Sequence, residues 1–249
     1  MTEPIRRLQK EAQMMNLERL IELRETLPKA EFSMSTAELL QRYERLQAAV
    51  VCDVLREHGL LDQAFPGRLQ ALRPERTVAG IAFTVKSSPN TRLSGELTFR
   101  AQMLDELHAQ AFVVWDTSGD ERATLWGGVM TATVVAKGVR GALVDGGIRD
   151  TAQILEKDFP VFYRYRSPNG SLGRCLITHY QLPVQIGDVF VRPGDVIVGD
   201  ADGAVCVPRE LAEAVLERAE EVISNEKTIF SWVAEGQSID EISRKGGYF

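Results

Sequence analysis

Residues 125–150, LWGGVMTATVVAKGVRGALVDGGIRD, join a glycine-rich helix start to an apolar strand that ends in two charged residues. The segment GGVMTATVVAKG predicts a helix that ends at Gly138, and GALVDGG predicts the buried strand that follows it. A helix followed at once by an apolar strand is the repeating unit of a parallel sheet. The stretch therefore predicts an α/β fold.

The predicted helix start offers a surface for an anion. It contains four residues whose backbone groups matter: Gly127, Gly128, Val129 and Met130. The first N–H groups of a helix lack partners within it and point outward with the positive end of the helix dipole, so they can hold a carboxylate. The alternative is that the two glycines only let the helix pack closely.

Arg149 and Asp150 follow the carboxyl end of the predicted strand, where open α/β sheets place ligands. Arginine offers a planar fork to a carboxylate or an enolate, and aspartate is a hard oxygen ligand for Mg²⁺ or Mn²⁺. An Arg-Asp pair by itself is more often a solvated helix start. Together with the helix start one βα unit earlier, the pair predicts a site for a small anion.

The same alternation continues outward. VAGIAFTVK and AFVVWD are predicted strands, with the helix LTFRAQMLDELHA between them, so we expect parallel βαβ units. After Phe159 the chain is mostly β, with a hairpin connection at 200–203, and a long helix is expected from about Pro208 to Val233. At the other end, residues 4–27 predict a helix outside the core, and Ser35 is expected to start another.

Composition limits the class of protein. The chain has 249 residues, of which 44% are hydrophobic and 26% charged, as in an ordinary globular protein. A net charge of -6 disfavours nucleic-acid binding, and no apolar run is long enough to span a membrane. The N-terminus lacks the apolar centre of a secretory signal, so a cytoplasmic protein is expected. Three cysteines are expected to be reduced and in or near the core: Cys52, Cys175 and Cys206.

The run WGGVMTATVVAKGVRGALVDGGIRD resembles the RraA-like family, which includes the 4-hydroxy-4-methyl-2-oxoglutarate aldolases, also called 4-carboxy-4-hydroxy-2-oxoadipate aldolases. Supporting matches are VVCDVLREHGLLDQ and VAGIAFTV before it and PGDVIVGDADGAVCVP after it, so the resemblance covers about residues 36 to 230. It implies an α/β/β sandwich related to swivelling phosphohistidine domains. The expected divisions are an N-terminal helical extension (1–34), a catalytic domain with a long C-terminal helix (35–235) and a C-terminal tail (236–249).

The resemblance also implies an activity, a divalent-metal-dependent carbon–carbon lyase. A small 2-oxo acid would react through a pyruvate-type enolate, by retro-aldol cleavage of a 4-hydroxy-2-oxo diacid, by oxaloacetate decarboxylation, or by both. Arg149 would hold the oxo-acid end and the enolate, Asp150 would anchor Mg²⁺ or Mn²⁺, and the amides of residues 127–130 would bind the substrate carboxylate. The protein would be a homotrimer or homohexamer, in which Glu226 of a neighbouring subunit orients a metal-bound water.

The chain also departs from the family pattern. Family aldolases carry a carboxylate 21 positions before the arginine, where this chain has Gly128, so one proton-handling group is missing. The segment 87–110 lacks the usual Gly-Asp-Asn and Pro-Gly-Asp turns, so the rim of the pocket differs and the sequence does not identify the substrate. The alternative function is that of the family's non-catalytic regulators, which bind an RNA-processing endonuclease, although the retained Asp150 favours an enzyme. A methyltransferase is disfavoured because no glycine-rich nucleotide loop follows the first β segment.

Further residues have side chains that could take part in chemistry. Three histidines have no ligand partner at helical spacing and are expected in structural or surface roles: His58, His108 and His179. Lys86 could form a Schiff base, but a solvated lysine at a strand end is favoured. Asp200 and Asp202 are explained by turn chemistry better than by a metal.

Overall fold

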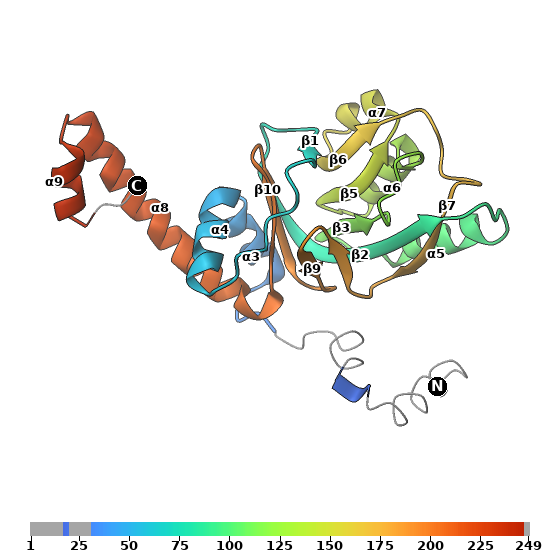
Figure 1. Cartoon of the computed structure of the whole chain (residues 1–249), viewed down its shortest axis with the longest axis horizontal. Coiled ribbons are helices and arrows are strands. Elements are labelled where there is room, and N and C mark those ends of the chain that lie inside the picture. Colours follow the sequence, from blue (N-terminus) through green and yellow to red (C-terminus); the bar gives the residue numbers. More distant parts are fainter. Residues whose placement is uncertain (1–16, 20–30, 247–249) are drawn as a thin grey trace.

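The computed structural model describes residues 17–19 and 31–246 (Figure 1). The helix predicted over 4–27 lies outside these residues, apart from residues 18 and 19, which are helical. The helices are α3 (Thr36–Tyr43), α4 (Ala48–Glu57), α5 (Glu96–Glu106), α6 (Gly128–Ala136), α7 (Thr151–Glu156), the 3-10 helix η1 (Arg209–Leu211), α8 (Ala212–Ala234) and α9 (Ile239–Arg244). The strands are β1 (Gln70–Ala71), β2 (Val78–Pro89), β3 (Ala111–Asp116), β4 (Thr124–Trp126), β5 (Gly141–Ile148), β6 (Val161–Arg166), β7 (Cys175–Tyr180), β8 (Val184–Ile186), β9 (Val189–Val191), β10 (Val196–Asp200) and β11 (Gly203–Val207).

The centre of the main sheet is parallel, as the alternation of strands and helices predicts. The order is β1-β6-β5-β3-β2-β10-β11, and the neighbours from β6 to β2 pair in parallel. β10 and β11 form the antiparallel hairpin expected at 200–203, in which Asp200 pairs with Gly203. Parallel strands bring their carboxyl ends to one edge of the sheet. The residues that follow β3 and β5 therefore lie near one another.

The sheet curls until it is nearly closed. Residues 64–71 link the two ends of the strand order. Ala64 forms a bridge with Val205 of β11, and β1 pairs with β6. Inside the curl, the Phe162 ring lies against Gly199 of β10, where an added Cβ would be 2.5 Å from the ring. A side chain at position 199 would therefore push the two sides of the sheet apart.

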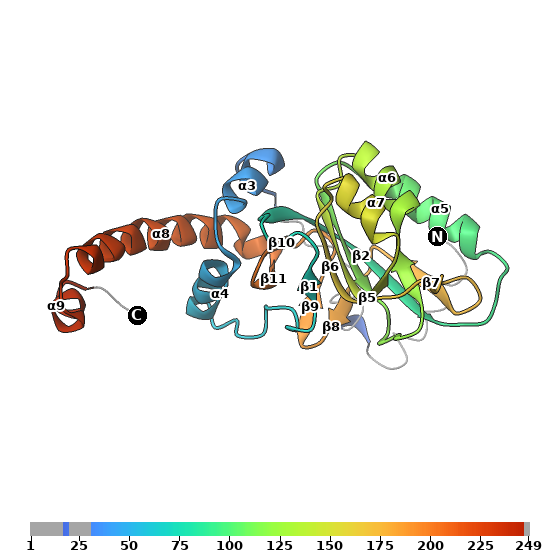
Figure 2. The same ribbon diagram turned by 90° about the horizontal axis from the view of Figure 1, so that it is seen from above.

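Three layers make up the body of the protein. Helices α5, α6 and α7 cover one face of the sheet (Figure 2), and Met103, Val134 and Ile154 anchor them in a core that includes Trp115. The β8–β9 hairpin covers the other face through a second core. This arrangement is the predicted α/β/β sandwich.

A third core joins α3, α4 and the first part of α8 to β10 and β11. Ser35 caps α3 as predicted, since its hydroxyl accepts a hydrogen bond from the backbone N–H of Glu38 at 3.2 Å. The long helix is confirmed as η1 followed by α8, whose outer part extends with α9 away from the body (Figure 1). No helix among the described residues has the length and apolar character to cross a membrane.

The three cysteines are free and lie as predicted. Cys175 and Cys206 are buried, and Cys52 is half-buried. Burial raises the pKa of the Cys175 thiol to about 11, so it stays protonated at neutral pH. The divisions expected at residues 34 and 235 stay a prediction.

Candidate active site

The helix start at Gly127 and the Arg149–Asp150 pair meet because β4 pairs with β5. Thr124 is opposite Gly147 and Trp126 is opposite Ile148, so both strands end at the same level. The backbone N–H of Arg149 donates to the Trp126 carbonyl at 3.0 Å, which continues the pairing beyond the strands. The two features that the sequence predicts separately therefore form one site.

Asp150 has a backbone conformation that turns its side chain back toward α6. Its φ of +55° and ψ of 37° are left-handed, which aspartate tolerates better than most residues. Its Oδ2 atom accepts a hydrogen bond from the Gly128 N–H at 3.1 Å and lies 3.6 Å from Nε of Arg149. The carboxylate thus lies between a cationic side chain and the positive end of a helix dipole.

Two more amides at the start of α6 are available to a ligand. The Thr131 N–H makes the first hydrogen bond of the helix, to the Gly127 carbonyl at 3.0 Å. Among the described residues, nothing accepts a hydrogen bond from the N–H of Val129 or Met130. These donors suit a carboxylate, as the sequence predicts.

The two glycines also lie in close contact with neighbouring side chains, as in the alternative that the sequence left open. A Cβ at Gly127 would lie 2.7 Å from Oδ2 of Asp150, and one at Gly128 would lie 1.8 Å from Oε1 of Gln153. Close packing and anion binding are therefore compatible, because the same bare backbone serves both.

A cavity of about 410 Å³ opens beside these groups. Arg149, Asp150 and Gly127 form one part of its wall, and Glu96 and Arg100 of α5 form another. The remaining wall is mostly hydrocarbon, from Leu97, Leu104, Leu125, Val129, Met130 and Leu172. Sequence reasoning missed Glu96 and Arg100, although their i, i+4 spacing on a predicted helix indicates an ion pair.

Arg100 is fully engaged in this wall. Its Nε donates to Glu96 at 2.9 Å, its Nη2 also reaches Glu96 and donates to Ser171 at 3.0 Å, and its guanidinium lies 5.5 Å from the centre of the Trp115 ring. The Glu96 side chain is only 1% exposed. The pair is a closed, neutral unit, so Arg149 carries the positive charge available to a ligand.

The residues present fit a divalent cation that keeps most of its water. Among the described residues there is no group of three or more His, Cys, Asp or Glu side chains able to hold a metal. Mg²⁺, however, is often bound through one or two carboxylates and several waters. Asp150 can supply one such ligand through Oδ1, which accepts no hydrogen bond within the described part of the chain.

Glu226 is not brought to this site within one chain. It lies in the outer part of α8, across the molecule from α6 and α7 (Figure 1), and does not line the cavity. A role for Glu226 requires a second subunit and stays a prediction.

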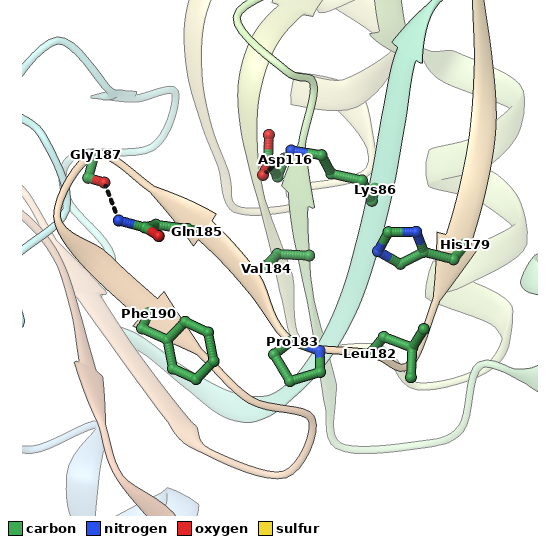
Figure 3. Close-up of a pocket in the computed structure, with 9 residues that line it drawn as sticks. All are labelled: Lys86, Asp116, His179, Leu182, Pro183, Val184, Gln185, Gly187 and Phe190. Atoms are coloured by element: carbon green, nitrogen blue, oxygen red, sulfur yellow. Dashed lines mark hydrogen bonds and ion pairs between the residues drawn. The ribbon is translucent and has the colours of Figure 1, made fainter. Parts of the chain in front are cut away.

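A second cavity, of about 560 Å³, lies on the other face of the sheet (Figure 3). Lys86 is directed there at Asp116, so the prediction of a solvated lysine is wrong: the side chain is 28% exposed and ion-paired. His179 pairs with Lys86 in the sheet and lines the same cavity, and burial lowers its pKa. The Lys86 nitrogen is engaged by the Asp116 carboxylate, whereas Arg149 lies beside a helix start whose amides at Val129 and Met130 have no acceptor among the described residues. We therefore place the candidate site at Arg149.

The remaining candidate residues lie on the surface or make structural contacts. His58 and His108 are exposed. The carboxylate of Asp200 accepts hydrogen bonds from the N–H of Ala48 at 2.8 Å and of Asp202 at 2.9 Å. These bonds cap a helix and shape a turn, as turn chemistry predicts.

Fold and site together describe a mixed α/β protein with a candidate small-anion site at the carboxyl end of a parallel sheet. A sequence model of the RraA-like family, described as Aldolase/RraA, matches residues 48–206, so the chain belongs to the RraA-like family.

Among curated proteins, an uncharacterized protein of Methanocaldococcus jannaschii is 32% identical over 172 residues, which are 69% of this chain and 80% of that protein. A protein of Halalkalibacterium halodurans with the provisional name 4-hydroxy-4-methyl-2-oxoglutarate aldolase is 29% identical over 75% of this chain and 85% of its own. Protein DlpA of Legionella pneumophila is 24% identical over 82% of this chain. DlpA is a longer protein, and the matched region is only 33% of its length. Named aldolases among the relatives support a lyase, at low identity.

Solved structures share the fold. One described among novel cellulases from microbes associated with the gut ecosystem has a TM-score of 0.85 and 59% identity, over 88% of this chain and 99% of its own. Streptomyces coelicolor RraAS2, described as an unusual member of the RNase ES inhibitor RraA protein family, has a TM-score of 0.71 and 27% identity, over 80% of this chain and 98% of its own. The similar proteins thus include named enzymes and a member of an inhibitor family.

Proposed function

We propose that this protein is a divalent-metal-dependent carbon–carbon lyase that acts on a small 2-oxo acid. The observation that carries the proposal is the convergence of Arg149, Asp150 and two unused amides of α6 on one cavity. A 2-oxo acid has a carboxylate next to a carbonyl, and bond cleavage at C3 leaves negative charge on the carbonyl oxygen. The site offers separate donors to the carboxylate and to that oxygen.

The residues divide the work as follows. The N–H groups of Val129 and Met130 bind the substrate carboxylate, and Arg149 neutralises the charge that develops on the 2-oxo group. Such a preorganised donor typically contributes about a hundredfold or more in rate. Asp150 would hold Mg²⁺ or Mn²⁺, which when bound supplies Lewis-acid polarisation of the carbonyl. Retro-aldol cleavage and oxaloacetate decarboxylation both use this stabilisation.

A regulatory function is the second candidate, because RraAS2 comes from a family described as RNase inhibitors. The lyase is supported by the position of Arg149 and Asp150 at a cavity that the two unused amides of α6 also line, an arrangement that suits a small anion better than a protein surface. Cellulase activity has less support from the site. Glycoside hydrolysis uses two carboxyl groups that flank the scissile bond, and of the two in this cavity Glu96 is buried against Arg100.

One assay separates these functions. Pyruvate release is measured from 4-hydroxy-2-oxo acids and from oxaloacetate, with Mg²⁺, with Mn²⁺ and with excess EDTA. Inhibition of an RNA-processing endonuclease and sugar release from a soluble cellulose derivative are measured in parallel. We expect pyruvate release that EDTA abolishes. Activity in either parallel assay without any pyruvate release would overturn the proposal.

A further inference from the structure

Much of the lining of the candidate site is hydrocarbon, and part of it is exposed to solvent. Leu97, Val129 and Leu172 all line the cavity, and these residues are 65%, 81% and 49% exposed in the single chain. Leu104, Leu125 and Met130 continue this wall inward. Exposed apolar residues gathered at one cavity are unusual on a soluble surface and mark a place where apolar groups bind.

The cavity has free positive charge for one carboxylate. Arg100 is neutralised by Glu96, and its other N–H groups reach Ser171 and the Leu125 carbonyl, the latter at 3.4 Å. Within residues 17–19 and 31–246, Arg149 has one ion-pair contact, to Asp150 at 3.6 Å, so its guanidinium can still bind a ligand. A second substrate carboxylate placed against Leu97 and Leu172 would gain no cation there, whereas a hydrocarbon group in the same place would remove apolar surface from water.

We infer that the substrate is a monocarboxylate, a 4-hydroxy-2-oxo acid with an apolar substituent on C4, and not a diacid. This inference rests on the proposed function and names its substrate class. The carboxylate and the 2-oxo group lie at α6 and Arg149, and the hydrocarbon group lies along Leu97, Leu104 and Leu172.

The reaction balances without a further reactant. The C3–C4 bond breaks, the C4 hydroxyl loses its proton to water because position 128 carries no carboxylate, and C4 becomes the carbonyl carbon of an apolar aldehyde. The electron pair of the broken bond passes to C3, which takes a proton from water to give pyruvate. Diacid and monocarboxylate substrates share these steps, so a comparison between them reports recognition of the C4 substituent.

The test is a series of 4-hydroxy-2-oxo acids that differ only at C4, with methyl, propyl, pentyl and carboxymethyl substituents. For the native protein we expect kcat/KM to rise about fourfold for each methylene that the cavity buries, the ratio that corresponds to the burial of one CH₂ group. The kcat/KM for the carboxymethyl acid should be at least about tenfold lower than that for the propyl acid, which is of similar size.

Variants at the wall sharpen the test. Leu172→Arg adds a cation to the rim of the cavity. It should raise the ratio of kcat/KM for the carboxymethyl acid to kcat/KM for the propyl acid at least about tenfold. Leu61→Arg is the matched control, because Leu61 is also exposed but lies outside the cavity, and it should leave the ratio unchanged.

The outcomes are distinct. Release of pyruvate with a preference for the diacid would overturn this inference and leave the proposed lyase standing. No pyruvate from any acid would remove the proposed function itself, and this inference with it. If Leu172→Arg changes the sedimentation coefficient and not the substrate ratio, the apolar rim is a contact between subunits, and the inference is overturned.

Discussion

The Oδ2 atom of Asp150 accepts a hydrogen bond from the backbone nitrogen of Gly128 over 3.1 Å. The carboxylate that we propose as the cation ligand is therefore oriented by the same helix start that is proposed to bind the substrate. The neighbouring amides of Val129 and Met130 remain available to a substrate carboxylate. The hydrogen bond holds Asp150 in place before any ligand arrives.

Asp150→Asn should abolish pyruvate release and weaken the binding of Mn²⁺ while the fold stays intact. Asparagine tolerates the left-handed backbone, so the variant removes charge without adding strain. Calorimetric titration with Mn²⁺ checks binding independently of turnover. Asp158→Asn is the matched control, because Asp158 is also left-handed, with φ of +51°, and lies outside the cavity. Full activity of Asp150→Asn in excess EDTA would contradict the metal-dependent mechanism.

Gly128→Asp should raise retro-aldol cleavage more than oxaloacetate decarboxylation. Cleavage needs a base for the C4 hydroxyl, and general-base catalysis contributes about a hundred- to ten-thousandfold. The new Cβ would meet the end of the exposed Gln153 side chain, which must turn away. Gly128→Asp/Gln153→Ala should therefore show the larger gain. If the native protein already cleaves 4-hydroxy-2-oxo acids as fast as it decarboxylates oxaloacetate, another base is present and this explanation of Gly128 is wrong.

Glu96→Gln should lower the free energy of unfolding by about 3 kcal/mol, because it leaves the Arg100 charge inside the wall without its counter-ion. Urea unfolding followed by circular dichroism measures the loss. The control is Glu57→Gln, which breaks a solvent-exposed pair with Arg218 and should leave the midpoint nearly unchanged. Equal losses in the two variants would mean that burial of the Glu96–Arg100 pair does not matter.

The stability contributed by Asp145 should fall as the pH rises. Burial raises the pKa of this carboxyl, against the attraction of Arg68 and Arg164. The folded protein then holds the proton more tightly than the unfolded chain, so stability is lost from the ordinary value of about 3.9 up to the raised pKa. The free energy of unfolding of the native protein minus that of Asp145→Asn should decrease across this window. A difference that grows with pH would mean that folding lowers the pKa of Asp145, which would contradict the prediction.

We expect the protein to form a closed homo-oligomer with three-fold symmetry, a trimer or a hexamer. Phe230 and Val233 on the outer part of α8 are exposed in the single chain, at 69% and 48%. Phe230→Arg should shift the protein toward monomer in sedimentation at micromolar concentration, whereas Leu61→Arg should not. An active monomer of the native protein would contradict the assembly and the role of Glu226 across subunits.

Most of the fold and part of the site could be predicted from the sequence, because the signals are local. Apolar periodicity indicated the parallel strands and α6, Ser35 indicated the start of α3, and the glycines before Val129 indicated a helix start with free amides. The position of Arg149 and Asp150 at a strand end followed in the same way. Each of these features depends on residues within a few positions of one another.

Only the tertiary structure decided what surrounds those residues. The pairing of β4 with β5 joins the helix start to Asp150, Arg100 reaches the cavity from α5 but is neutralised there, and Gln153 fills the space over Gly128. The same packing pairs Lys86 with Asp116, a carboxylate 30 positions away in the chain. Contacts between distant segments depend on how helices and strands pack, and periodicity within a segment carries no record of that packing.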